Sequence, residues 1–190
     1  MIYAVCHCRF VAKADVGRWP LIGTLAAAAG TLFIERKSRR DAWRVVQQIA
    51  DRLQAGDAIA VFPEGTSSDG VDVLPFHANL VQAAIAAHAP VQPVAIRFSD
   101  AASATHSLAP CYIDNDTLIG SIWRILNAPQ LRATLMFGEQ QLTQGRERRG
   151  WSADLHLAVT NLRVNPLTVE RGSRRSGVIG INKEALRMMF

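Results

Sequence analysis

Residues 58–68 read Ala58-Ile59-Ala60-Val61-Phe62-Pro63-Glu64-Gly65-Thr66-Ser67-Ser68. The apolar run at its start predicts a buried strand. Pro63 ends that strand, because proline lacks the N–H that strand pairing needs, and Gly65 permits a turn that a residue with a Cβ resists. Open α/β sheets bind ligands at the carboxyl ends of their strands. We therefore expect a binding loop at residues 63–68; the alternative is an ordinary strand exit with a solvated Glu64.

Strands and helices alternate on both sides of this stretch. Short apolar runs predict strands within residues 2–12 and at 31–34, 58–62 and 91–98, and helices are expected at 20–29, 39–55 and 76–88. In the helix 39–55 the apolar residues form one stripe. The alternation implies right-handed crossovers. The predicted fold class is α/β, a largely parallel (mixed) sheet flanked by helices.

The pattern is weaker beyond residue 99. We expect strands at 111–113 and 133–137 and helices at 118–126 and 152–162. The chain has 190 residues, of which 49% are hydrophobic and 19% are charged, which fits one domain at residues 1–165. Residues 166–190 carry five basic and two acidic residues and are predicted to be a flexible, basic tail.

Composition excludes several classes of protein. Much of the net charge of +5 lies in the tail, which disfavours a nucleic-acid partner. Three cysteines, an odd number, indicate a reducing, cytosolic setting. Cys6-His7-Cys8 alternates across a strand, and no second ligand pair follows, so no metal is expected. No secretory signal is visible, and the uncharged segment 19–34 is interrupted by Pro20 and falls short of the roughly 20 apolar residues of a membrane span.

Three blocks of the sequence resemble blocks of a known family. They are Gly30-Thr31-Leu32-Phe33-Ile34-Glu35-Arg36, Phe62-Pro63-Glu64-Gly65-Thr66-Ser67 and Pro90-Val91-Gln92-Pro93-Val94. In order and spacing they are similar to the second, third and fourth blocks of the lysophosphatidic-acid acyltransferases, the glycerolipid acyltransferase family. The likeness covers about residues 9–137.

The resemblance implies an O-acyltransferase of phospholipid biosynthesis. Such an enzyme moves a fatty acyl group from acyl-CoA or acyl carrier protein to a lysophospholipid such as 1-acylglycerol 3-phosphate. It implies no cofactor beyond the acyl donor. It also implies peripheral contact with the cytoplasmic face of the membrane.

The resemblance also assigns roles to five residues. Arg36 would hold the phosphate of the acceptor, since a guanidinium offers paired donors to phosphate oxygens. Glu64 and Gly65 would form the acceptor-binding turn, with Thr66 as the adjoining polar group. Pro93 would belong to the acyl-donor side. Two alternatives remain: Arg36 as a solvated member of the basic run 36–44, and Pro93 as a proline at a strand edge.

The sequence departs from the family in its catalytic block. The family uses a histidine as general base, with an aspartate five residues later that orients the imidazole. None of His7, His77, His88, His106 and His156 has an aspartate at that spacing. We therefore expect an N-terminally incomplete acyltransferase domain with the catalytic pair upstream of Met1.

Three other readings stay open. His77 follows Phe76 where the family commonly has lysine, which leaves the acceptor head group open and makes a lyso-ornithine lipid acyltransferase a neighbouring possibility. A truncated, inactive protein that binds lysophospholipid is the second alternative. The third is a binder of nucleic acid or anionic surfaces through Arg36-Lys37-Ser38-Arg39-Arg40 and the tail.

Overall fold

The computed structural model describes residues 2, 6–35, 38–103, 106–113, 116–164 and 188–189. The strands are β1 (Arg9–Lys13), β2 (Leu32–Ile34), β3 (Ile59–Ala60), β4 (Val91–Gln92), β5 (Val94–Ser99), β6 (Arg132–Phe137) and β7 (Met188–Met189). The helices are α2 (Ile22–Ala28), α3 (Arg39–Gln54), α4 (Ala78–Ala87), α5 (Leu118–Asn127) and α6 (Arg148–Val164), with a 3-10 helix η1 at Ala14–Arg18.

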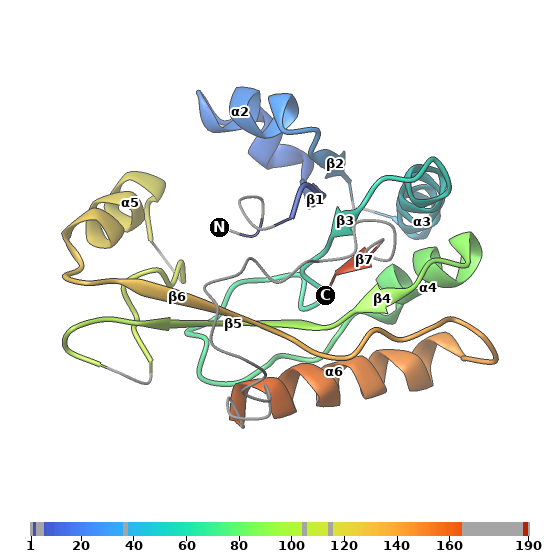
Figure 1. Cartoon of the computed structure of the whole chain (residues 1–190). Coiled ribbons are helices and arrows are strands. Elements are labelled where there is room, and N and C mark those ends of the chain that lie inside the picture. The colour runs from blue at the N-terminus through green and yellow to red at the C-terminus, as the bar shows by residue number, and fades with distance from the viewer. Residues whose placement is uncertain are drawn as a thin grey trace.

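Two sheets form the framework of the molecule (Figure 1). The first has five parallel strands in the order β2-β1-β3-β7-β4. The second pairs β5 with β6 in antiparallel register, from Val94 opposite Phe137 to Ser99 opposite Arg132. The predicted α/β class with a largely parallel sheet is therefore confirmed.

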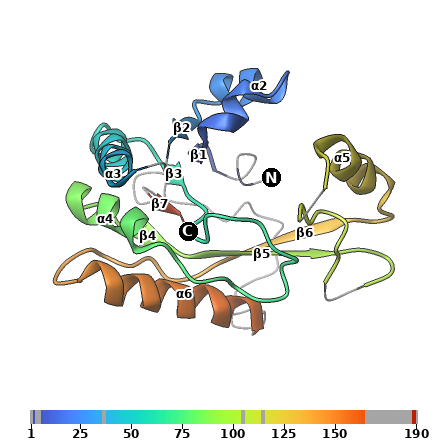
Figure 2. The same ribbon diagram turned by 180° about the vertical axis from the view of Figure 1, so that it is seen from behind.

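The main core lies between the parallel sheet and the helices α3, α4 and α6. The stripe predicted for α3 is buried there, with Ile49 and Leu53 fully inaccessible. Ser38 starts this helix by accepting a hydrogen bond from the Asp41 N–H at 3.1 Å. Trp151 and Leu155 of α6 reach the same core. Viewed from behind, α6 runs below the strands while α3 and α4 lie together at the left (Figure 2).

Several predicted boundaries change. The strand predicted at 58–62 shortens to β3, and the one predicted at 91–98 divides at Pro93, which cannot donate a backbone hydrogen bond. The helix predicted at 20–29 is found as the shorter α2, and the 3-10 helix η1 precedes it at residues that were not predicted to be helical. The strand predicted at 111–113 is wrong: these residues form a loop held by side chains rather than by a neighbouring strand.

The predicted tail is also wrong in one part. Met188 and Met189 form β7, between β3 and β4 in the parallel sheet, so they belong to the domain. Residues 165–187 and 190 lie outside the described residues, as does most of the strand expected near residues 2–5. Flexibility of the rest of the tail stays a prediction.

Candidate active site

A cavity of about 800 Å³ lies at the carboxyl ends of β1 and β3. Its floor includes Val11 of β1 and Ala60 of β3, and one wall is the predicted binding loop from Phe62 to Ser68. Strand β5 contributes a second wall. The cavity is therefore where an open parallel sheet is expected to bind a ligand.

A tight turn begins the loop. The Gly65 N–H donates to the Phe62 carbonyl at 3.1 Å, with Pro63 in the second position, where its fixed φ favours a turn. Gly65 has a φ of +69°, a left-handed conformation that costs a residue with a Cβ about 1 kcal/mol or more. The predicted need for glycine at this position is confirmed.

Glu64 closes the loop on itself. Its carboxylate accepts a hydrogen bond from the Leu74 N–H at 2.8 Å, and the His77 N–H donates to the Pro63 carbonyl at 2.8 Å. The alternative of a fully solvated Glu64 is therefore wrong, because the side chain is half-buried and bonded. These two hydrogen bonds close the loop of residues 65–73 at its base, beside the cavity.

Helix α6 supports the far side of this loop. Nε2 of His156 lies 3.0 Å from the Val73 carbonyl, and its ring meets the edge of Phe76 with centroids 5.1 Å apart. Arg163 donates to the Gly70 carbonyl, and Arg97 of β5 donates to the Arg163 carbonyl. The position of the loop thus depends on a helix more than 80 residues later in the chain.

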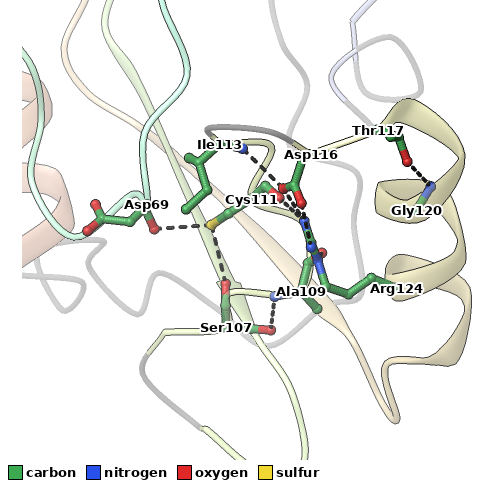
Figure 3. A network of polar contacts seen from close by, with 9 residues as sticks. All are labelled: Asp69, Ser107, Ala109, Cys111, Ile113, Asp116, Thr117, Gly120 and Arg124. Carbon is green, nitrogen blue, oxygen red and sulfur yellow. Dashed lines mark hydrogen bonds and ion pairs between the residues drawn. The ribbon is translucent and has the colours of Figure 1, made fainter.

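A second loop, residues 106–113, also lines the cavity. The Cys111 thiol donates to the Asp69 carbonyl at 3.1 Å, which joins the two loops (Figure 3). Burial raises the pKa of Cys111, which favours the protonated thiol that donates this hydrogen bond. His106 also lines the cavity, and its buried Nε2 has no hydrogen-bond partner among the residues that the structure describes.

The structure brings together three of the five predicted site residues. Glu64, Gly65 and Thr66 all line the cavity. Pro93 is fully buried and is not among the described residues that line it. It lies between β4 and β5, where its carbonyl accepts from the Gly138 N–H at 2.9 Å, which fits the alternative of a proline at a strand edge. Arg36 lies outside the described residues, so its role stays a prediction.

Sequence reasoning missed the cavity residues outside the three blocks. Lys13 at the end of β1 places a cation on the cavity wall, and His106 and Cys111 come from a loop whose path no local pattern reveals. The apolar residues of β1 before Lys13 are the signal that could have located Lys13 at the cavity, because β1 runs parallel to β3 and both strands end at the same edge of the sheet.

Cys6-His7-Cys8 lies just before β1 and is not itself part of a strand. Cys8 is buried, and burial together with the neighbouring Cys6 raises the pKa of its thiol to about 11. Among the described residues, no group of three or more histidine, cysteine or acidic side chains could hold a metal ion.

A protein-family model described as Acyltransferase matches residues 1–97. The chain belongs to the Acyltransferase family. It is 37% identical, over 134 residues, to a 1-acyl-sn-glycerol-3-phosphate acyltransferase of Neisseria gonorrhoeae, covering 70% of this chain and 52% of the relative. It is 35% identical, over 159 residues, to a lyso-ornithine lipid O-acyltransferase of Pseudomonas aeruginosa, covering 84% of this chain and 60% of the relative.

A solved structure has the same fold. The 1-acyl-sn-glycerophosphate acyltransferase PlsC from Thermotoga maritima matches with a TM-score of 0.60 at 18% identity, over 88% of this chain and 59% of that one. This acyltransferase-family chain thus spans between half and two thirds of the length of these relatives. No described helix is long and apolar enough to cross a bilayer.

Proposed function

We propose that this chain forms the acceptor-binding part of a lysophospholipid O-acyltransferase. In the reaction, the acceptor hydroxyl attacks the thioester carbon of acyl-CoA or acyl-acyl carrier protein; an ester C–O bond forms, the C–S bond breaks, and the thiol leaves with the proton. The proposal needs no cofactor besides the acyl donor. It rests above all on the position of Glu64, Gly65 and Thr66 at the wall of the 800 Å³ cavity.

The residues of the cavity suit an amphipathic acceptor. Its lining combines the polar loop with apolar side chains such as Val11, Phe76 and Val94, so a head group and the start of an acyl chain find matching surfaces. Lys13 and Arg36 supply positive charge for a phosphate, Arg36 by resemblance alone. The acceptor we propose is 1-acylglycerol 3-phosphate.

A lyso-ornithine lipid is the second candidate acceptor. It is supported by the Pseudomonas aeruginosa relative, which matches a larger share of this chain than the Neisseria protein does. His77, where the phosphate-specific family commonly has lysine, supports it too. In either case we place the protein peripherally on the cytoplasmic face of the membrane.

Equilibrium binding tests the proposal. Lysophosphatidate and lyso-ornithine lipid are titrated, below their micelle concentrations, into the wild-type chain, Arg36→Ala and Arg40→Ala. Arg40 is an exposed neighbour in the same basic run and serves as the control. We expect Arg36→Ala to weaken lysophosphatidate binding about tenfold or more and Arg40→Ala to leave it unchanged. Equal weakening by both removes the role of Arg36, and no binding of either lipid overturns the proposal.

Turnover tests the chemistry separately. No histidine of the sequence is followed by an aspartate at the fifth position, and loss of a positioned general base lowers rates by roughly 10²- to 10⁴-fold. We expect residues 1–190 to bind the acceptor but to transfer acyl groups slowly. Transfer at rates typical of acyltransferases would show that another group in this chain acts as the base.

A further inference from the structure

Helix α5 presents its apolar side to the outside. Ile119, Trp123 and Leu126 are 81%, 69% and 74% exposed and lie on one face at helical spacing. The opposite face holds Ser121, which is only 5% exposed, and Arg124. A surface helix of a soluble protein normally has the reverse arrangement, with its apolar stripe toward the core.

Polar contacts attach the inner face of α5 to the protein. Arg124 points from the helix into the loop before it, where it pairs with Asp116 at 2.7 Å and donates to the carbonyls of Ala109 and Cys111 (Figure 3). Thr117 caps the helix by accepting from the Gly120 N–H at 3.1 Å. These contacts fix the rotation of α5 about its axis, so the outward apolar face is a defined feature of the fold.

Helix α5 follows a loop that reaches the cavity. The loop that leads into α5 contributes Cys111 and Tyr112 to the cavity wall, and Trp19, just before α2, lines the same cavity. Near α2, Leu21 and Leu25 are 80% and 69% exposed. In Figure 1, α2 lies at the top and α5 at the upper left, apart from α3, α4 and α6. Two segments with exposed apolar residues therefore flank one cavity.

The composition of α5 fits a lipid surface. The helix has no acidic residue, and it combines aliphatic side chains with a tryptophan, which favours the boundary between head groups and acyl chains. The chain has a net charge of +5, which favours an anionic membrane. Resting on the proposed function, an acceptor that partitions into bilayers would enter a cavity that opens beside this helix.

We propose that α5 docks the protein on an anionic phospholipid bilayer, with its apolar face inserted at the level between head groups and acyl chains. The Leu21 and Leu25 region is the second contact. The cavity mouth then faces the leaflet, and a lysophospholipid reaches the Glu64 turn without leaving the interface completely.

Tryptophan quenching tests this assignment directly. Vesicles of phosphatidylglycerol and phosphatidylethanolamine, with or without brominated acyl chains and free of lysolipid, are added to the wild-type chain, Trp123→Phe and Trp43→Phe. Trp43 of α3 is 60% exposed and is the matched control. We expect brominated lipid to quench the wild type and Trp43→Phe equally and to quench Trp123→Phe less, since Trp19, beside the second contact, is then the remaining tryptophan near the bilayer.

A partition measurement complements it. The triple variant Ile119→Ser, Trp123→Ser and Leu126→Ser should bind vesicles at least about tenfold more weakly than the wild type does. Leu157→Ser, on the exposed side of α6, should bind them as the wild type does. Circular dichroism verifies that the variants are folded, and the conservative Trp123→Phe keeps the test valid if the triple variant is not.

Three results would overturn the proposal. They are absence of vesicle binding, quenching that is as strong in Trp123→Phe as in the wild type, and a dimer in sedimentation whose formation depends on Trp123 while lipid does not bind. The last would identify a second copy of the chain as the occupant of this face. Because the vesicles contain no lysolipid, these results do not depend on acceptor binding. Failure of the membrane proposal can therefore be told apart from failure of the proposed function.

Discussion

The contacts of Glu64 allow us to separate two roles of this residue, which are holding the loop and, in our proposal, orienting the acceptor. One carboxylate oxygen accepts from the Leu74 N–H and holds the loop, while the side chain also lines the cavity. Holding the loop needs an oxygen that accepts a hydrogen bond, whereas orienting the hydroxyl of the acceptor lipid needs the carboxylate. A pair of variants therefore distinguishes them.

We expect Glu64→Ala to lower the free energy of unfolding by about 1–3 kcal/mol, because the Leu74 N–H loses a charge-assisted partner in a half-buried site. Glu64→Gln keeps an acceptor oxygen and should lose less than about 1 kcal/mol. Urea unfolding measures both. If Glu64→Gln keeps its stability but loses lysophospholipid binding, the carboxylate contacts the acceptor directly. An unchanged stability in Glu64→Ala would show that the Leu74 contact does not hold the loop.

At the level of single residues, the sequence predicts what a local pattern encodes. The proline and glycine around Glu64 predict the turn, which lies where we expect it, whereas β3 already ends at Ala60. The bond from Glu64 to Leu74 joins residues ten apart across a loop without periodicity, so no pattern reveals it. The same holds for Cys111, whose partner Asp69 lies 42 residues away.

The elements show a similar division. The apolar spacing of residues 118–126 predicts helix α5 almost to its ends. Which face of that helix points outward is decided by Arg124 and its partners in the preceding loop, and periodicity alone favours the wrong face. The same partners explain why residues 111–113 are not a strand: their backbone groups bond to the side chains of Asp116 and Arg124.

The attachment of α5 should depend on pH. The hydrogen bonds from Arg124, and then from the Ile113 N–H, lower the pKa of Asp116 from 3.8 to about 2. A carboxyl group with a lowered pKa in the folded state stabilises that state above its unfolded pKa and loses this contribution as the pH falls toward the folded value. We expect the difference in unfolding free energy between the wild type and Asp116→Asn to be constant above about pH 5 and to shrink between about pH 4 and 2.

Urea unfolding across this range measures the effect, and Arg124→Ala provides the control. Since the guanidinium is the first cause of the shift, Asp116→Asn should show much less pH dependence when it is made in the Arg124→Ala background. If the difference in unfolding free energy between the wild type and Asp116→Asn stayed constant down to pH 2, the pairing of Asp116 with Arg124 would be contradicted.

For the whole molecule, alternating strands and helices predict the parallel sheet, because crossovers have one hand and short connections leave few arrangements. They do not predict how the sheet is completed. β3 and β4 do not pair with each other in the structure; both pair with β7, from the other end of the chain. A two-residue strand in a segment of mixed composition carries no periodic signal, which is why the region was expected to be a tail.

Met188 therefore contributes to stability across the molecule. Its side chain is fully buried in the main core, and its backbone lies in register with Ile59 of β3 and Val91 of β4. Met188→Ala leaves a cavity where the two halves of the parallel sheet meet, and we expect it to lower the free energy of unfolding by about 2–4 kcal/mol. Leu142→Ala, at a residue 59% exposed, should change it by less than about 0.5 kcal/mol. If Met188→Ala and Leu142→Ala both lost little unfolding free energy, and to an equal extent, β3 and β4 would not depend on β7. The parallel sheet would then end at β3.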